Sequence, residues 1–141
     1  MSWFGLSQPK LAAMALGLGA LLVAAVPSFA HHSFASTYLE DATPIKIEGK
    51  LVQFQLRNPH SFVHVEAKDP KTGQMVRWTV EWGAAGQLAS QGIGQGSFKI
   101  GDTVVLTGSP GRDPADHRLR MRSIVRPSDN KSWGLQGQTF N

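Results

Sequence analysis

The alternation of apolar and polar residues that begins at Ile45 constrains the fold more than any other feature of the chain. A period of two is that of a β-strand with one buried face. Beside Gly49 the alternation slips by one position, and the apolar residues on its two sides are Ile45, Ile47 and Leu51, then Val52, Phe54 and Leu56. A slip of this kind next to glycine indicates a bulged and strongly bent strand.

Four further strands and one helix are predicted. The first strand ends at Arg57, because Asn58-Pro59 is a turn signal and proline cannot donate to a ladder. A turn at Asp69–Gly73 joins the second strand to the third. Apolar residues at helical spacing from Ala85 predict a short helix that Gly92 terminates. The later strands follow the same alternation, and the predicted ranges are Ser61–Lys68, Gln74–Trp82, Thr103–Gly108 and Arg118–Val125.

The resulting order is β-β-β-α-β-β. Five short, curved strands in this order predict an all-β domain with one short helix, a five-stranded Greek-key barrel of the OB type. Closing the sheet removes the exposed edges that an open five-stranded sheet would have to protect. We expect the barrel to span residues 45–126, after an extended arm at 31–44 and before a loosely held tail at 127–141.

The first thirty residues have the pattern of a cleaved signal peptide. A positive start with Lys10 precedes an uncharged apolar run from Leu11 to Val26, and Ser28-Phe29-Ala30 has small residues where a signal peptidase reads. The run is shorter than the roughly 20 residues of a spanning helix, although a retained N-terminal anchor is the alternative. We predict cleavage after Ala30, a periplasmic or secreted protein, and no stable membrane span after processing.

Charge and composition exclude several classes of function. The mature chain carries 13 Lys and Arg against 10 Asp and Glu, a net charge of +3. Since export separates the protein from nucleic acid, we do not interpret this excess as a DNA or RNA signal. The chain has no cysteine, which excludes disulfides, thiol chemistry and cysteine-zinc sites. No nucleophile elbow or phosphate loop is present, and we expect a binding domain, not an enzyme.

Four motifs together carry a resemblance to a known family. They are His31-His32-Ser33-Phe34 directly after the leader, Asn58-Pro59-His60 at the end of the first strand, an aromatic-rich third strand, and Lys99-Ile100-Gly101-Asp102 before the fourth. In this combination the chain resembles a family of small exported bacterial proteins of unknown function. The resemblance covers nearly all of residues 31–125. It implies an OB-like barrel and no established activity, and the glycine-rich segment 92–96 departs from the family pattern.

Cleavage before His31 would create a metal chelator. The new terminal amine and the imidazole of the same residue can bind one ion, and a second imidazole from the barrel would complete a three-nitrogen site. Such a site suits copper, which heads the affinity order of the divalent ions. An α-amine with a reference pKa of about 7.7 is partly deprotonated near neutral pH. The alternative amino-terminal copper motif needs histidine where Ser33 stands, and His32 could replace His31 as a ligand.

The barrel ligand is predicted to be His60, then His64. The two share one parity, but four residues of strand span about 13 Å, so both reach one ion only with fully extended side chains. The alternative is that His60 makes a turn hydrogen bond and His64 is a surface residue. His117, between Asp116 and Arg118 in a polar loop, is interpreted as a solvated residue, and no calcium-loop spacing surrounds it.

A second candidate site is a basic surface. Arg118, Arg120 and Arg122 alternate along the fifth strand, and Phe62, Arg77 and the turn residue Asn58 are predicted to lie on the same binding surface. They could dock an anionic lipid, glycan or protein of the envelope, and a solvated strand face is the simpler interpretation. Trp78 and Trp82 are interpreted as core residues in preference to a sugar-stacking platform. A purely structural envelope protein is the third class.

Overall fold

The computed structural model describes residues 32–134. The chain divides into two compact units, residues 1–33 and 34–141, and the barrel lies wholly in the second. The predicted signal peptide, the cleavage point, His31 and Phe140 lie outside the described residues. None of the described helices is long and apolar enough to cross a membrane.

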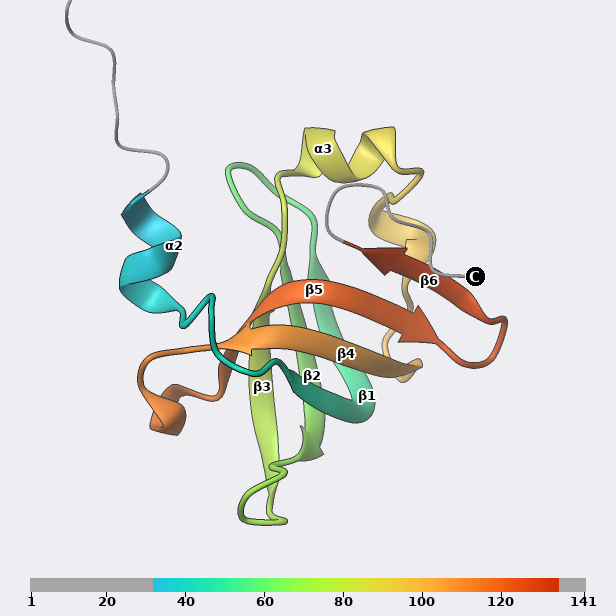
Figure 1. Cartoon of the computed structure of the whole chain (residues 1–141). Coiled ribbons are helices and arrows are strands. Elements are labelled where there is room, and N and C mark those ends of the chain that lie inside the picture. Colours follow the sequence, from blue (N-terminus) through green and yellow to red (C-terminus); the bar gives the residue numbers. More distant parts are fainter. Residues whose placement is uncertain (1–31, 135–141) are drawn as a thin grey trace, which may run out of the picture. The chain divides into compact units, whose positions relative to one another are not determined.

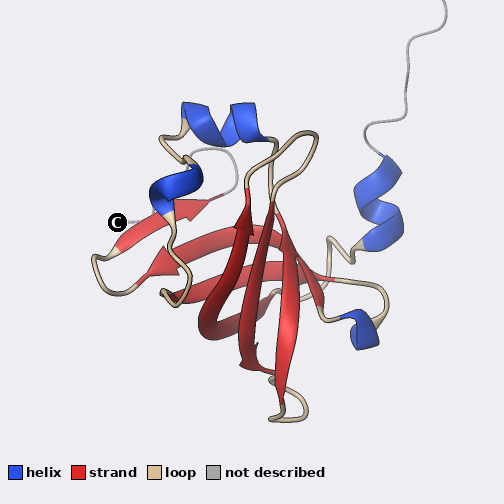
Figure 2. Ribbon diagram, turned by 180° about the vertical axis from the view of Figure 1, so that it is seen from behind, coloured by secondary structure: helices blue, strands red, loops and turns tan. Residues whose placement is uncertain are grey.

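The second unit is a closed five-stranded barrel with a sixth strand added at one edge (Figure 1). The strands are β1 (Ile45–Gln55), β2 (Phe62–Lys68), β3 (Met75–Glu81), β4 (Thr103–Pro110), β5 (Arg118–Arg126) and β6 (Lys131–Gly134). Their order is β3-β2-β1-β4-β5-β6, and parallel pairing of Thr79–Glu81 with Arg118–Arg120 closes the barrel. The predicted OB-like barrel is therefore confirmed. Helical segments lie outside the curved sheet (Figure 2), at α2 (His32–Thr37), α3 (Ala85–Ser90), η1 (Gln95–Ser97) and η2 (Pro114–Asp116).

The bend in β1 has the predicted cause. The pairing of β1 with β2 shifts register between Leu51 and Gln53, so Val52 is the extra residue of a bulge. A Cβ on Gly49 would lie 2.2 Å from the carbonyl oxygen of Glu66, which shows why only glycine fits at the bend. One strand therefore pairs with β2 through its second half and with β4 through its first.

The predicted inward residues form most of the core, but on β5 a register shift buries Ile124 in place of the predicted Val125. Trp78 and Trp82 are among its members, as expected, and both are almost fully buried. The helix α3 contributes Leu88, and Gly92 follows it at φ +77°, in the left-handed region that favours glycine. The core residues include Ile47, Leu51, Phe54, Val63, Val65, Val80, Leu106, Leu119, Met121 and Ile124.

Two segments differ from the prediction. Residues 32–37 were expected to be extended and form the helix α2, while Lys131–Gly134, expected in a loose tail, forms β6 against β5. Trp133 of β6 packs edge to face on Phe98 with ring centroids 4.9 Å apart. Both segments contain few residues, four and six, too few for a periodic pattern to distinguish strand, helix and coil.

Candidate functional site

His60 lies at the barrel end where the N-terminal arm crosses β3. Asn58-Pro59 is a cis peptide bond, and the turn places His60 beside Glu81, the last residue of β3. The Nδ1 atom of His60 lies 2.6 Å from Oε1 of Glu81. The carboxylate therefore orients the ring and leaves Nε2 as the nitrogen on its other side. We call Phe34, Tyr38, His60 and Glu81 the His60 cluster.

Glu81 is the residue that sequence reasoning missed. Its alternation with Val80 predicted an outward, solvated side chain, but Glu81 is only 8% exposed. The arm covers it, because Tyr38 donates its hydroxyl proton to Oε2 of Glu81 at 2.5 Å. Burial and the neighbouring carboxylate raise the pKa of Tyr38 well above its ordinary value. A covering residue from another segment is not visible in a strand's own period.

The arm is held against the barrel by several independent contacts. The Phe34 ring packs against the His60 ring at a tilt of 34°, with centroids 4.8 Å apart. The Arg120 guanidinium lies 3.8 Å from the Phe34 centroid. Leu39 and Arg112 make backbone bonds across to Pro110 and Thr37. Phe34 is the last residue of the His-His-Ser-Phe motif, and His60 is the last residue of the Asn-Pro-His turn. These two residues of the family motifs are therefore in contact.

His64 occupies a different environment on the same outward parity of β2. Its Nδ1 lies 3.2 Å from the Thr79 hydroxyl, its cross-strand partner. Desolvation by burial lowers its pKa from 6.5, and the charges of Arg77 and Arg57 lower it further. His64 is thus held neutral to a lower pH, among cations that disfavour a second positive charge.

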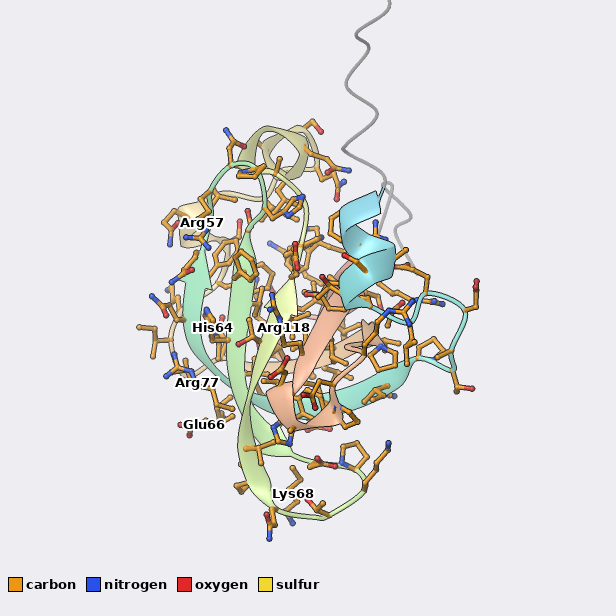
Figure 3. The ribbon with its side chains drawn as sticks, turned by 90° about the vertical axis from the view of Figure 1, so that its left-hand side faces the viewer. Arg57, His64, Glu66, Lys68, Arg77 and Arg118 are labelled. Atoms are coloured by element: carbon orange, nitrogen blue, oxygen red, sulfur yellow. The ribbon has the colours of Figure 1, made fainter. Side chains whose placement is uncertain are left out.

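The surface around His64 is basic and partly aromatic. Arg57 stacks over Phe62 at 4.8 Å, and Phe62 stacks with His64 at 6.5 Å. Figure 3 shows His64, Arg77, Glu66 and Lys68 along the β2–β3 hairpin, with Arg57 above them and Arg118 of β5 at the level of His64. An open cleft of about 410 Å³ lies here. We call the surface formed by Arg57, Phe62, His64, Arg77, Thr79 and Arg118 the β2–β3 face.

The arginines of β5 have partners within the protein. Arg120 bonds Glu40 at 2.7 Å, Arg122 bonds the Ser109 hydroxyl at 2.9 Å and the Glu40 carbonyl, and Arg118 lies 3.7 Å from Glu81. Arg120 and Arg122 thus tie the arm to the barrel. Arg118 also borders the cleft of the β2–β3 face, so one of the three predicted basic residues on β5 belongs to that surface.

Of the remaining predicted residues, some are exposed and others have a partner in the protein. Asn58 is exposed in the turn, and Arg77 is exposed opposite Glu66 on the paired strand. His117 is not simply solvated, since its Nε2 lies 3.1 Å from Oδ2 of Asp69. Of His32 the structure describes the backbone, as the first residue of α2. Within residues 32–134 no group of three or more His, Cys, Asp or Glu is arranged to hold a metal ion.

Comparison with known proteins places the chain in a family. A model described as a family of unknown function (DUF6152) matches residues 19–120. The chain belongs to this family. None of the curated proteins matches it. Among solved structures, the mitochondrial single-stranded DNA-binding protein of S. cerevisiae aligns with a TM-score of 0.43 at 13% identity, over 60% of this chain and 92% of that one.

Proposed function

We propose that this member of the family is an exported, non-catalytic binding domain that holds a copper ion between its processed N-terminus and His60. The observation that carries the proposal is the 2.6 Å contact between Nδ1 of His60 and Oε1 of Glu81. Metal-binding histidines commonly donate the second ring nitrogen to a carboxylate, which fixes the tautomer and raises ligand basicity. The same arrangement makes Nε2 of His60 the atom suited to an ion.

The chain length between Phe34 and His31 is compatible with the other proposed ligands. Phe34 touches the His60 ring, and His31 precedes Phe34 by three residues. Three residues span at most about 11 Å, so a mature terminus at His31 could reach the same imidazole. The amine and imidazole of His31 with His60 Nε2 make the three-nitrogen set that copper favours. His32 and His64 are the alternative ligands, and the β2–β3 arginines make His64 the weaker one.

A titration with Cu(II), followed by paramagnetic resonance, tests the proposal. The protein starting at His31 should bind one ion with nitrogen hyperfine structure. Retaining Ala30 converts the amine into a peptide bond and should weaken binding at least about a hundredfold, by the tenfold-per-1.4 kcal/mol relation. His60→Ala should act in the same direction, and His64→Ala serves as the matched control. Equal affinity with and without Ala30 would exclude the terminal brace.

A second candidate, a metal-free module for an anionic envelope partner, is favoured by the β2–β3 face. Arg57, Arg118 and His64 line the cleft together with Phe62 and Asp116. Arg77 lies on β3 opposite Glu66. Guanidinium groups and a stacking ring suit sulfated or phosphorylated glycans. Retention on immobilised heparin should fall after the double change Arg57→Glu and Arg77→Glu. Lys99→Glu with Lys131→Glu, which makes the same charge change at exposed residues elsewhere, is the control.

A further inference from the structure

A mostly apolar pocket of about 360 Å³ lies beside the β2–β3 cleft, and Arg118 lines both. Three segments far apart in the sequence form it: the arm, the β2–β3 turn and the β4–β5 loop. We call it the Trp78 pocket, and its apolar lining includes Leu39, Ile45, Trp78, Pro110 and Pro114. Its volume lies at the lower end of the roughly 300–1,000 Å³ range of small-molecule sites.

Two buried hydrogen-bond donors without acceptors belong to this pocket. Within the described residues, the buried side-chain polar atoms that lack a partner are Nε1 of Trp78 and Nε of Arg118. Both residues line the Trp78 pocket. An unpaired buried donor costs about 1–3 kcal/mol, and native structures satisfy nearly all such groups. Each of the two atoms has less than 1 Å² of accessible surface, so an acceptor in the pocket reaches them only after a small shift of the two side chains.

Charge at the pocket favours an anionic acceptor. Lys71, Arg112 and Arg118 line it against Asp69 and Asp113. The two carboxylates are already used locally. Asp69 accepts from the backbone of Lys71 and Thr72 and bonds His117, and Asp113 accepts from the backbone of Ala115. The pocket thus offers cationic and N–H donor groups beside an apolar wall.

We propose that the Trp78 pocket binds an amphipathic small molecule with an apolar body and a carboxylate head. The apolar body contacts Leu39, Ile45 and Trp78, and the head pairs with the ammonium group of Lys71. A small shift of the pocket wall then lets the head accept from the two unpartnered donors. The geometry requires no metal and no part of residues 1–31. The pocket proposal therefore does not depend on the copper proposal.

Titration of the ¹⁵N-labelled protein with decanoate, below its micelle concentration, tests the proposal. Trp78→Phe identifies the Trp78 indole resonance. A hydrogen bond to the carboxylate should move that resonance downfield in a saturable manner. Decylamine has the same apolar chain and the opposite charge, and decan-1-ol has no charge, so both should bind more weakly and shift the resonance less. Equal responses to the three ligands, or no saturable response to decanoate, would overturn the proposal.

Matched variants locate the site. Lys71→Glu should weaken decanoate binding about three- to tenfold at low salt, as expected for reversing one charge near an anion in a water-like dielectric. Lys68→Glu makes the same charge change on the same hairpin, outside the pocket lining, and should leave affinity unchanged. Ala42→Phe fills the pocket and should abolish binding with the other indole resonances retained. His60→Ala should have no effect, and a loss of decanoate binding in that variant would contradict the separation of the two sites.

Discussion

His60 and His64 lie four residues apart, yet the charged groups beside their rings have opposite signs. The ring of His60 is bonded to a buried carboxylate and covered by the arm. The ring of His64 is bonded to a neutral hydroxyl and faces two arginines that lower its pKa. A carboxylate therefore faces the first imidazole, whereas cations face the second. Position along a strand therefore does not determine the role of a histidine; the residues contributed by other segments do.

The largest expected effect is on copper binding at the His60 side. Glu81→Gln keeps the size of the side chain and removes the charge behind the imidazole. Loss of such an outer partner typically reduces metal affinity about 10- to 100-fold. Thr79→Val makes the corresponding change beside His64 and should leave copper affinity unchanged. Isothermal titration with Cu(II) measures both, and equal losses would show that the two histidines do not differ as described.

The same pair of positions should differ in stability. Glu81→Ala removes the acceptor of both Tyr38 and His60 in a mostly buried setting, which should lower the free energy of unfolding by roughly 2–4 kcal/mol. Thr79→Val removes one half-buried hydroxyl and should cost less than about 1 kcal/mol. Urea unfolding followed by tryptophan fluorescence gives both values. A larger loss for Thr79→Val would reverse the comparison.

Charge neutralisation should change the pKa of His64. Arg77→Gln removes a cation opposite β2 and should raise the pKa of His64 toward 6.5 without reaching it, because burial is the largest cause of the lowering. Titration of the imidazole carbon protons by NMR measures the change. Arg126→Gln, whose guanidinium bonds Asp129 beside β6, is the control. A pKa of His64 that stays fixed in Arg77→Gln would show that the charge of Arg77 makes no contribution to the lowering.

The smallest effect concerns stability and pH. Because the folded-state pKa of His64 lies below the value of 6.5 in the unfolded chain, the unfolded state binds more protons below that pH. His64 therefore contributes full stability above pH 6.5, and this contribution is lost as the pH falls toward the lowered pKa. His64→Gln should show a smaller drop in urea midpoint between pH 7.5 and 5.5 than the unchanged protein. An identical drop would mean that His64 does not titrate differently on folding.

The barrel could be predicted from the sequence, while the His60 cluster could be predicted only in part. The two-residue period, the slip beside Gly49 and the turn at Asp69–Gly73 are local signals, and each is present in the structure at the expected place. Glu81 has the same outward parity as Thr79, but Tyr38 covers one and not the other. No local pattern encodes that cover, since it depends on an arm some forty residues earlier in the chain.

The cover also explains why Arg120 and Arg122 fit neither interpretation of the β5 arginines, a docking surface or a solvated strand face. Their alternation is that of an exposed strand face, and Arg118 does border an open cleft. Arg120 and Arg122 instead bond Glu40 of the arm. The sequence contains no signal that pairs Glu40 with Arg120 and Arg122. These residues come together only when the barrel closes, and no periodic pattern reports that contact.

Barrel closure has a consequence for the order in which the molecule assembles. The strand that carries Glu81 is paired on its second side by Arg118–Arg120, which leave the ribosome or a translocation channel almost forty residues later. Pairing between such distant segments forms slowly compared with local contacts. Until β5 has been synthesised, Glu81 has no contact with Arg118, and Phe34 has no contact with Arg120. A nascent or truncated chain would therefore leave the His60 imidazole uncovered, and the His60 cluster assembles only after β5 has paired with β3.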